Sequence, residues 1–296
     1  MALYELLNLT FQFLDSFAFI VLATVGLAII FGMMGIINLA HGEFILVGAY
    51  ATTLSFNLLG VPLVLAMLVG IIATTVYGII LERLIIHRLY GRLLDSMVVT
   101  FGISLVMIQL TRIVFGNSLD QIGTPFGGIS YGVYSYSAYR IMLAGAAILT
   151  LAALYVVFTR TTFGIKARAT IQDEETARSM GVDTDRMYLS TFAIGSALAG
   201  LTGALYAPTI TMSPDLGANF LVEAFVAVVV GGPSVLIGTS LAGGFLGTID
   251  AIFTYVGGTF IGQVALLTAA IFAIRFLPDG ITGLLEDIRA KRREAQ

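Results

Sequence analysis

Long apolar runs without a single charged residue alternate with short polar segments along this chain. Six of these runs contain no Asp, Glu, Lys or Arg, namely 16–40, 44–81, 141–159, 187–214, 224–249 and 251–274. A helix rises about 1.5 Å per residue and the hydrocarbon core of a bilayer is roughly 30 Å thick, so about 20 apolar residues span it. The pattern predicts an all-α fold, a polytopic transmembrane helical bundle in a lipid bilayer.

Some of the runs do not correspond to one simple crossing. Residues 44–81 would form a helix of about 57 Å, so they are expected to make two passes, with Pro62 placed to start the second. Gly231-Gly232-Pro233 and Gly257-Gly258 divide the stretch 222–277 into shorter pieces. Broken pieces are tolerated only where their backbone is buried or faces water. We therefore expect about eight or nine hydrophobic segments, some of them short or broken.

Composition supports a single membrane domain over residues 1–296. The chain is 58% hydrophobic and 11% charged, whereas a soluble domain carries about 25% charged residues. Cysteine is absent and only two histidines occur, so we predict no disulfide, no metal site and no cofactor. No phosphate-binding loop occurs, and the G-x-S-x-G match at 128–132 lies in a polar loop without the strand–turn–helix context of a hydrolase. These absences disfavour an enzyme, and no nucleic-acid partner is expected.

Basic residues predict the orientation of the spans, because cytoplasmic loops carry an excess of Lys and Arg. Three clusters hold 13 of the 15 basic residues: Arg83, Arg88 and Arg92; Arg160, Lys166, Arg168, Arg178 and Arg186; and Arg275, Arg289, Lys291, Arg292 and Arg293. The loop 160–186 and the C-terminus are therefore predicted inside, and the Gly-, Ser- and Tyr-rich loop 116–139 outside. The first fifteen residues contain no basic residue, which argues against a cleavable signal peptide there.

Polar residues gather between the first two apolar runs, where Asn38, His41 and Glu43 fall within six residues among glycines. Polar groups at membrane depth cost several kcal/mol unless they are partnered. One interpretation is a broken segment whose three polar side chains line a translocation pathway or hold a gate. The other is a cytoplasmic elbow whose side chains cap helix ends and bond to each other.

Two isolated acids, Glu223 and Asp250, lie in otherwise uncharged stretches. A charge at the bilayer centre costs roughly 2.5–3.5 kcal/mol on insertion scales and usually faces a cavity or a partner. Both are candidates for the translocation pathway, and a structural ion pair or snorkelling is the alternative.

Small residues recur every four positions at Gly195, Ala199, Gly203 and Ala207. Helices in lipid pack closely through such residues. The stripe predicts helix packing, either static or at an interface that moves.

The polar loop 160–186 predicts a short exposed helix. Asp173 can cap a helix beginning at Glu174 and Glu175, whose charges suit the helix dipole. Gly181 supplies a C-terminal stop. Such a helix between two spans is either a docking element for a soluble partner or a solvated linker.

Several of these segments resemble one family. GIINLAHGEFILVGAY at 35–50, the stretch FGIKARATIQDEETARSMGVDTDR and the Gly-rich AFVAVVVGG are similar to segments of the Liv-type permeases (LivH/LivM), the membrane subunits of branched-chain amino acid ABC importers. The resemblance covers essentially the whole chain. Pro233-Ser234-Val235 departs from the family's usual Gly-Gly-x-Gly-Ser, and SPDLGANF also resembles related permeases for urea and short amides.

The resemblance implies a permease subunit in a bacterial inner membrane, with a second homologous permease, two cytoplasmic ATPases and a soluble substrate-binding protein as partners. Residues 164–183 would be the segment that couples to the ATPase, with the coupling residues Gly164, Lys166, Arg168, Asp173, Glu174, Glu175, Ala177 and Gly181. ATP hydrolysis would then occur on another chain. The rivals are a permease for urea or short amides, a secondary transporter with inverted repeats, and an intramembrane enzyme.

Overall fold

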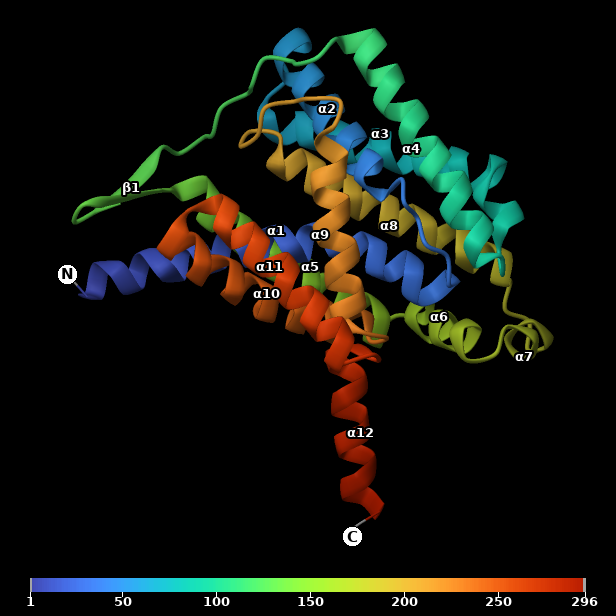
Figure 1. Ribbon diagram of the computed structural model, residues 1–296. Helices are drawn as coiled ribbons and strands as arrows, with labels where there is room; N and C mark the ends of the chain where they lie inside the picture. Colours follow the sequence, from blue (N-terminus) through green and yellow to red (C-terminus); the bar gives the residue numbers. More distant parts are fainter. Residues whose placement is uncertain (1, 295–296) are drawn as a thin grey trace. The chain divides into compact units, whose positions relative to one another are not determined.

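The computed structural model describes residues 2–294, with side chains described from residue 3 to residue 288. Helices make up most of this part of the chain (Figure 1). In order they are α1 (Ala2–Met34), α2 (His41–Leu59), α3 (Leu63–Leu84), the 3₁₀ helix η1 (Ile86–Leu89), α4 (Leu93–Phe115), α5 (Ala138–Arg160), α6 (Thr162–Gln172), α7 (Glu174–Ser179), α8 (Thr184–Tyr206), α9 (Leu216–Gly231), α10 (Val235–Gly257), α11 (Thr259–Phe276) and α12 (Gly280–Glu294).

Eight helices within residues 2–294 are long and apolar enough to cross a membrane, and α9 is a shorter apolar helix. The predicted all-α polytopic bundle is therefore confirmed. The run 44–81 forms two helices, α2 and α3, and Pro62 lies directly before α3, as expected. Gly60, at the end of α2, adopts a left-handed conformation that closes the turn between them.

The glycine breaks in the last third of the chain also lie where the sequence predicts them. α9 ends at Gly231 and α10 begins at Val235, while α10 ends at Gly257 and α11 begins at Thr259. Gly232 and Gly258 have φ angles of 84° and 86°, a region that residues with a Cβ rarely adopt. These two positions fix where each helix stops.

The first helix differs from the apolar run that predicts it. The uncharged run starts at residue 16, yet α1 begins at Ala2 and ends at Met34. Asp15 does not interrupt the helix, because its carboxylate forms an ion pair with Arg140 at the start of α5. At the other end, residues 35–38 have no regular structure and 39–40 form a turn.

The polar loop after α4 contains an element that the sequence analysis does not foresee. Strands β1 (Gly128–Tyr131) and β2 (Tyr134–Ser137) pair antiparallel in a hairpin, with Tyr131 opposite Tyr134. The G-x-S-x-G match lies in this hairpin, and Gly132 sits in its turn with a φ angle of 59°. The nucleophile geometry of a hydrolase needs a strand–turn–helix, so the match has no catalytic meaning here.

The described residues divide into two compact units. The first contains those up to Val25, Thr124–Ala152 and those from Glu223 onward, and the second contains Gly26–Gly123 and Ala153–Val222. The expectation of one permease domain remains a prediction.

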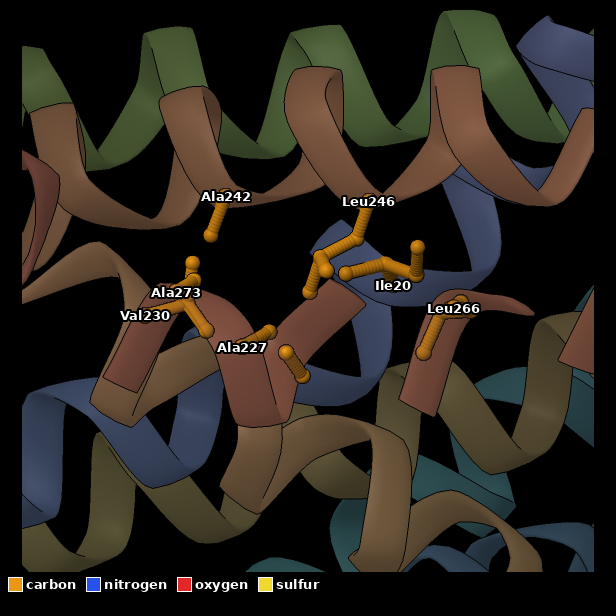
Figure 2. Packing of buried hydrophobic residues seen from close by; sticks show 8 residues of the cluster. Ile20, Ala227, Val230, Ala242, Leu246, Leu266 and Ala273 are labelled. Carbon is orange, nitrogen blue, oxygen red and sulfur yellow. The ribbon is translucent and has the colours of Figure 1, made fainter. Parts of the chain in front are cut away.

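The first unit has a core of small and branched apolar side chains. The cluster joins α1, α9, α10 and α11 through Ile20, Ala227, Val230, Ala242, Leu246, Leu266, Ala270 and Ala273. Figure 2 shows Ala242 and Leu246 pointing from α10 toward the other helices of the cluster. The Thr282 hydroxyl donates to the carbonyl of Gly231 at 2.8 Å and ties α12 to the end of α9.

The second unit is built on backbone-to-backbone packing of α2, α3 and α8, which lie side by side in Figure 1. A Cβ added to Gly203 of α8 would lie 2.0 Å from the carbonyl oxygen of Ile45, and one added to Gly48 of α2 would lie 2.6 Å from that of Gly200. Phe44 of α2 fills the space beside these contacts, with its ring 5.7 Å from that of Phe192. Only glycine permits this approach, which gives close dispersion contact in the absence of a hydrophobic drive.

Gly203→Ala is expected to destabilise the protein, because the new methyl group meets the α2 backbone. Overpacking of this kind costs about 1–3 kcal/mol of unfolding free energy. The control is Gly102→Ala in α4, where nothing lies within 4 Å of an added Cβ. Thermal unfolding in detergent should show a lower midpoint for the first variant alone, and equal midpoints would contradict the packing described here.

Candidate functional site

The elbow between α1 and α2, defined here as residues 35–43, is enclosed by protein. Asn38, His41 and Glu43 are only 1%, 1% and 2% exposed. The backbone N–H of Leu39 donates to the hydroxyl of Thr100 in α4 at 3.0 Å. The structure therefore brings the three polar residues together inside the second unit.

Glu43 connects the elbow to the middle of a span. Its Oε1 atom accepts a hydrogen bond of 3.0 Å from the hydroxyl of Ser104, and Ser104 lies midway between the ends of α4. The elbow is thus enclosed at the level of the middle of α4 rather than exposed at the end of a span. The Oε2 atom of Glu43 has no hydrogen-bond partner within the described part of the chain, which is a costly state for a buried polar atom.

Asn38 bonds locally instead. Its Oδ1 atom accepts a hydrogen bond of 3.0 Å from the backbone N–H of Ala40, which satisfies a free donor just before α2. Its Nδ2 group has no hydrogen-bond partner among residues 2–294. Asn38 thus bonds within the elbow while Glu43 reaches across to α4, and both interpretations of these residues remain predictions.

Close packing surrounds the elbow from two further directions. A Cβ added to Gly42 would lie 2.0 Å from the carbonyl oxygen of Gly217, at the start of α9. A Cβ added to Gly217 would lie 2.9 Å from Oε1 of Glu43, and one added to Gly26 of α1 would lie 3.0 Å from Cε1 of His41. The elbow is thus held between the ends of α1 and α9.

The two isolated acids do not belong to the elbow, because both are in the first unit. Asp250 of α10 accepts a hydrogen bond of 2.5 Å from the hydroxyl of Ser16 in α1. Glu223 of α9 is half-buried. Their roles in a translocation pathway remain predictions.

The stripe of small residues on α8 lies against neighbouring helices. A Cβ added to Gly195 would lie 2.5 Å from the side chain of Ile30 in α1, and Gly203 contacts α2. Ala199 and Ala207 are fully buried. The contacts are those of close helix packing, and movement at this interface remains a prediction.

Asp173 caps α7 as the sequence predicts. Its Oδ1 atom accepts a hydrogen bond of 2.9 Å from the backbone N–H of Thr176, and Oδ2 accepts one of 2.7 Å from the Thr176 hydroxyl. These bonds lower the pKa of Asp173 below its ordinary value, the backbone bond most, so the capping carboxylate is ionised at neutral pH. Gly181, with a φ angle of 86°, ends the helix, and the N–H of Val182 donates to Ala177 at 3.0 Å.

Most of α7 is exposed. Ala177 is the buried residue of this helix, whereas Glu175 is exposed and Met180 is 81% exposed. In the preceding α6, Gly164 packs on the backbone of Phe158. The charged residues Lys166 and Arg168 are exposed, and the guanidinium of Arg168 donates to the carbonyl of Phe158.

Two polar pairs of the second unit were not found from the sequence. The Nη2 group of Arg112 in α4 donates to both carboxylate oxygens of Asp215, at 3.1 and 3.0 Å. Glu82 of α3 is 1% exposed and accepts a hydrogen bond from the hydroxyl of Tyr90. The signal for the first pair was the position of Arg112, which lies outside the three basic clusters.

Comparison with known proteins gives consistent matches over most of the chain. The family model described as "Branched-chain amino acid transport system / permease component" matches residues 9–275. The probable branched-chain amino acid transport permease LivH of Methanocaldococcus jannaschii is 26% identical, covering 90% of this chain and 89% of its own. BraD of Pseudomonas aeruginosa, a high-affinity branched-chain amino acid transport system permease, is 27% identical, covering 88% and 91%.

A relative with a different name matches less of the chain. LivM of Salmonella typhimurium, also named a high-affinity branched-chain amino acid transport system permease, is 25% identical over 69% of this chain and 54% of its own. No solved structure matches the chain significantly. Because the family model covers most of a multi-pass helical chain that has the expected segments, the chain belongs to the family of permease components of branched-chain amino acid transport systems.

Proposed function

We propose that this chain is the transmembrane permease subunit of an ABC importer that takes up branched-chain amino acids. Family membership over residues 9–275 and relatives named for this transport support the proposal. Eight helices suited to crossing a membrane supply the bundle through which a solute would pass. The chain itself would hydrolyse no ATP.

The observation that carries the proposal is α7, a capped, exposed helix next to a span in a chain of this family. A separate ATPase needs a formed helix to push on, and α7 is one, capped at its start by Asp173 and ended at Gly181. One cytoplasmic ATPase would bind α7 of this chain. A second ATPase would bind the corresponding segment of a second homologous permease. Relatives named LivH and LivM both occur, which supports such a pair.

The remaining parts follow from this assignment. A soluble substrate-binding protein would dock on the outer side, at the 116–139 loop. The protein would lie in a bacterial inner membrane with its C-terminus in the cytoplasm, consistent with the basic clusters. All of residues 1–296 would then serve as one permease domain.

The elbow is the candidate for a closed point on the pathway. Gly42 and Gly217 touch, and Glu43 is buried, so a solute would pass only after the start of α9 moves away from α2. Glu43 would then present its unpartnered Oε2 atom. An amino acid zwitterion carries an ammonium group that suits such an acceptor.

Uptake by a reconstituted complex tests the transported solute. Liposomes that contain this chain, its partner permease, its ATPases and its binding protein should accumulate labelled leucine, isoleucine or valine only when ATP is present. Uptake of urea or a short amide in place of leucine would contradict the substrate class. Leucine uptake by the isolated chain without any ATPase would contradict the whole proposal.

Asp173→Ala should weaken association with the ATPase, because the free N–H groups at the start of α7 lose their acceptor. Asp173→Asn keeps a side-chain oxygen at the same place and is the matched control. Co-purification of the ATPase should fall for the alanine variant and be largely retained for the asparagine variant. If both variants bind the ATPase as well as the original chain, α7 is not the docking element.

Glu43→Gln should reduce leucine uptake about tenfold, the effect expected of losing one charged hydrogen-bonding group. Glutamine keeps the size of the side chain and its bond to Ser104. ATPase association should be unchanged, because α7 is not altered. Glu5→Gln, at an exposed position of α1, is the control, and equal uptake by both variants would remove Glu43 from the pathway.

A further inference from the structure

Side-chain contacts connect α7 to the buried carboxyl group of Glu82 in α3. Glu174, in the first turn of α7, accepts a hydrogen bond at Oε2 from the hydroxyl of Tyr188 in α8, at 2.9 Å. The ring of Tyr188 contacts that of Tyr90, with centroids 4.8 Å apart. The hydroxyl of Tyr90 in turn donates to Oε1 of Glu82. Four side chains from α7, α8, the segment before α4, and α3 thus form one continuous series.

At the buried end of the series, Glu82 depends on Tyr90 for its hydrogen bond. Glu82 is 1% exposed, and its Oε2 atom accepts no hydrogen bond within the described residues, with Nε of Arg83 4.0 Å away. Nδ1 of His87 lies 3.9 Å from Oε1, and the ring of His87 packs edge-on against Tyr90. Burial, and then the bond to Glu82, raise the pKa of Tyr90 above its ordinary value. The phenol therefore remains protonated and able to donate.

At the exposed end of the series, an ion pair with Arg178 holds Glu174 in place. Oε1 of Glu174 lies 2.9 Å from Arg178, which also donates to the Thr184 hydroxyl at 2.5 Å and to Asp185 at 3.3 Å. α7 has only six residues and one buried side chain, Ala177. Polar contacts with the first turns of α8, rather than an apolar core, therefore attach α7 to the bundle.

The backbone route from α7 to α8 is less suited to transmit a displacement. It passes through Gly181 in a left-handed conformation, and glycine has a wider range of backbone conformations than any other residue. Glu82, by contrast, lies on a helix that packs tightly on the rest of the second unit. A Cβ on Gly78, one turn before Glu82, would lie 2.1 Å from the hydroxyl of Ser196 in α8 and 3.3 Å from the ring of Phe44 in α2.

We propose that Glu174, Tyr188, Tyr90 and Glu82 form a positioning relay that transmits the movement of α7 to α3 and, through it, to α2 and the elbow. The inference rests on the proposed function, in which an ATPase moves α7. The four residues touch neither the solute nor ATP. They couple hydrolysis to transport because they connect α7 to the bundle through side chains, in addition to its backbone connection.

The test measures leucine taken up per ATP hydrolysed by the complete reconstituted complex. Tyr188→Phe and Tyr90→Phe each remove one hydroxyl and keep the ring contact. Loss of a hydrogen bond to a carboxyl group should lower the ratio about tenfold, while ATPase association and ATP hydrolysis continue. Tyr155→Phe, at a position of α5 that is 58% exposed, is the matched control and should leave the ratio unchanged.

Combined and conservative variants separate a relay from a merely structural role. The double variant Tyr188→Phe/Tyr90→Phe should take up as much leucine per ATP as the more impaired of the two single variants. A series that is interrupted at one contact loses nothing more from a second interruption. Glu82→Gln keeps an acceptor for Tyr90 and should couple better than Glu82→Leu. Two independent losses that multiply in the double variant would overturn the relay, and so would equal coupling by the Gln and Leu variants.

The chain contains no cysteine, so the movement can be measured directly. Spin labels on Ser179→Cys in α7 and Leu84→Cys at the end of α3, both exposed, report the distance between the two helices with and without ATP. In the original chain the distance between the labels should be the same with and without ATP, because the relay moves the two helices together. In Tyr188→Phe this distance should change on ATP binding. An unchanged distance in the variant overturns the relay.

Failure of the proposed function and failure of the relay give different experimental results. If the original complex imports leucine without its ATPase, the proposed function is wrong and the relay falls with it. If the original complex couples normally and both tyrosine variants keep its ratio of leucine to ATP, only the relay is wrong.

Discussion

A backbone group inside a bilayer finds no water to bond with, and this constraint governs the whole chain. It explains why most described residues are helical, and it applies to the elbow, where the chain leaves helical structure between α1 and α2. There the N–H of Leu39 uses the hydroxyl of Thr100, and the N–H of Ala40 uses the side chain of Asn38. The N–H of Gly35 still reaches the carbonyl of Phe31. The break is possible because polar side chains replace the missing helical bonds.

The same constraint explains the glycines around the elbow. Helices in lipid gain little from apolar burial alone and depend on close contact. Gly42, Gly48 and Gly203 let α2 approach the start of α9 and α8 at backbone distance. At these glycines the contacts are between backbones, and side chains such as Phe44, whose ring lies 5.7 Å from that of Phe192 in α8, pack beside them.

The elbow and α7 belong to the same compact unit, the second. α2 begins in the elbow and packs on α3 and α8. α7 is attached to the first turns of α8. α7, α8 and α2 are thus connected within one unit, which also contains the contact between Gly42 and Gly217. Arg112 and Asp215 hold the other end of the same group of helices, joining α4 to the segment before α9.

The sequence by itself determined the helices, their approximate ends and the cap of α7. These features depend on the length of apolar runs, on Gly and Pro, and on residues three or four positions apart, as with Asp173 and Thr176. It also predicted that 44–81 folds as two helices and that glycines divide the last third of the chain. The start of α1 at Ala2 and the β1–β2 hairpin were missed, because a paired Asp15 and short strands leave no clear pattern.

Only the tertiary structure decided which polar groups meet. Glu43 and Ser104 are 61 residues apart, and Arg112 and Asp215 are 103 apart, so no local pattern links them. The partner of each buried group depends on which helices pack together and in what register. A single sequence specifies that packing through many weak contacts at once, and for this reason the elbow's enclosure and the series from Glu174 to Glu82 appear only in three dimensions.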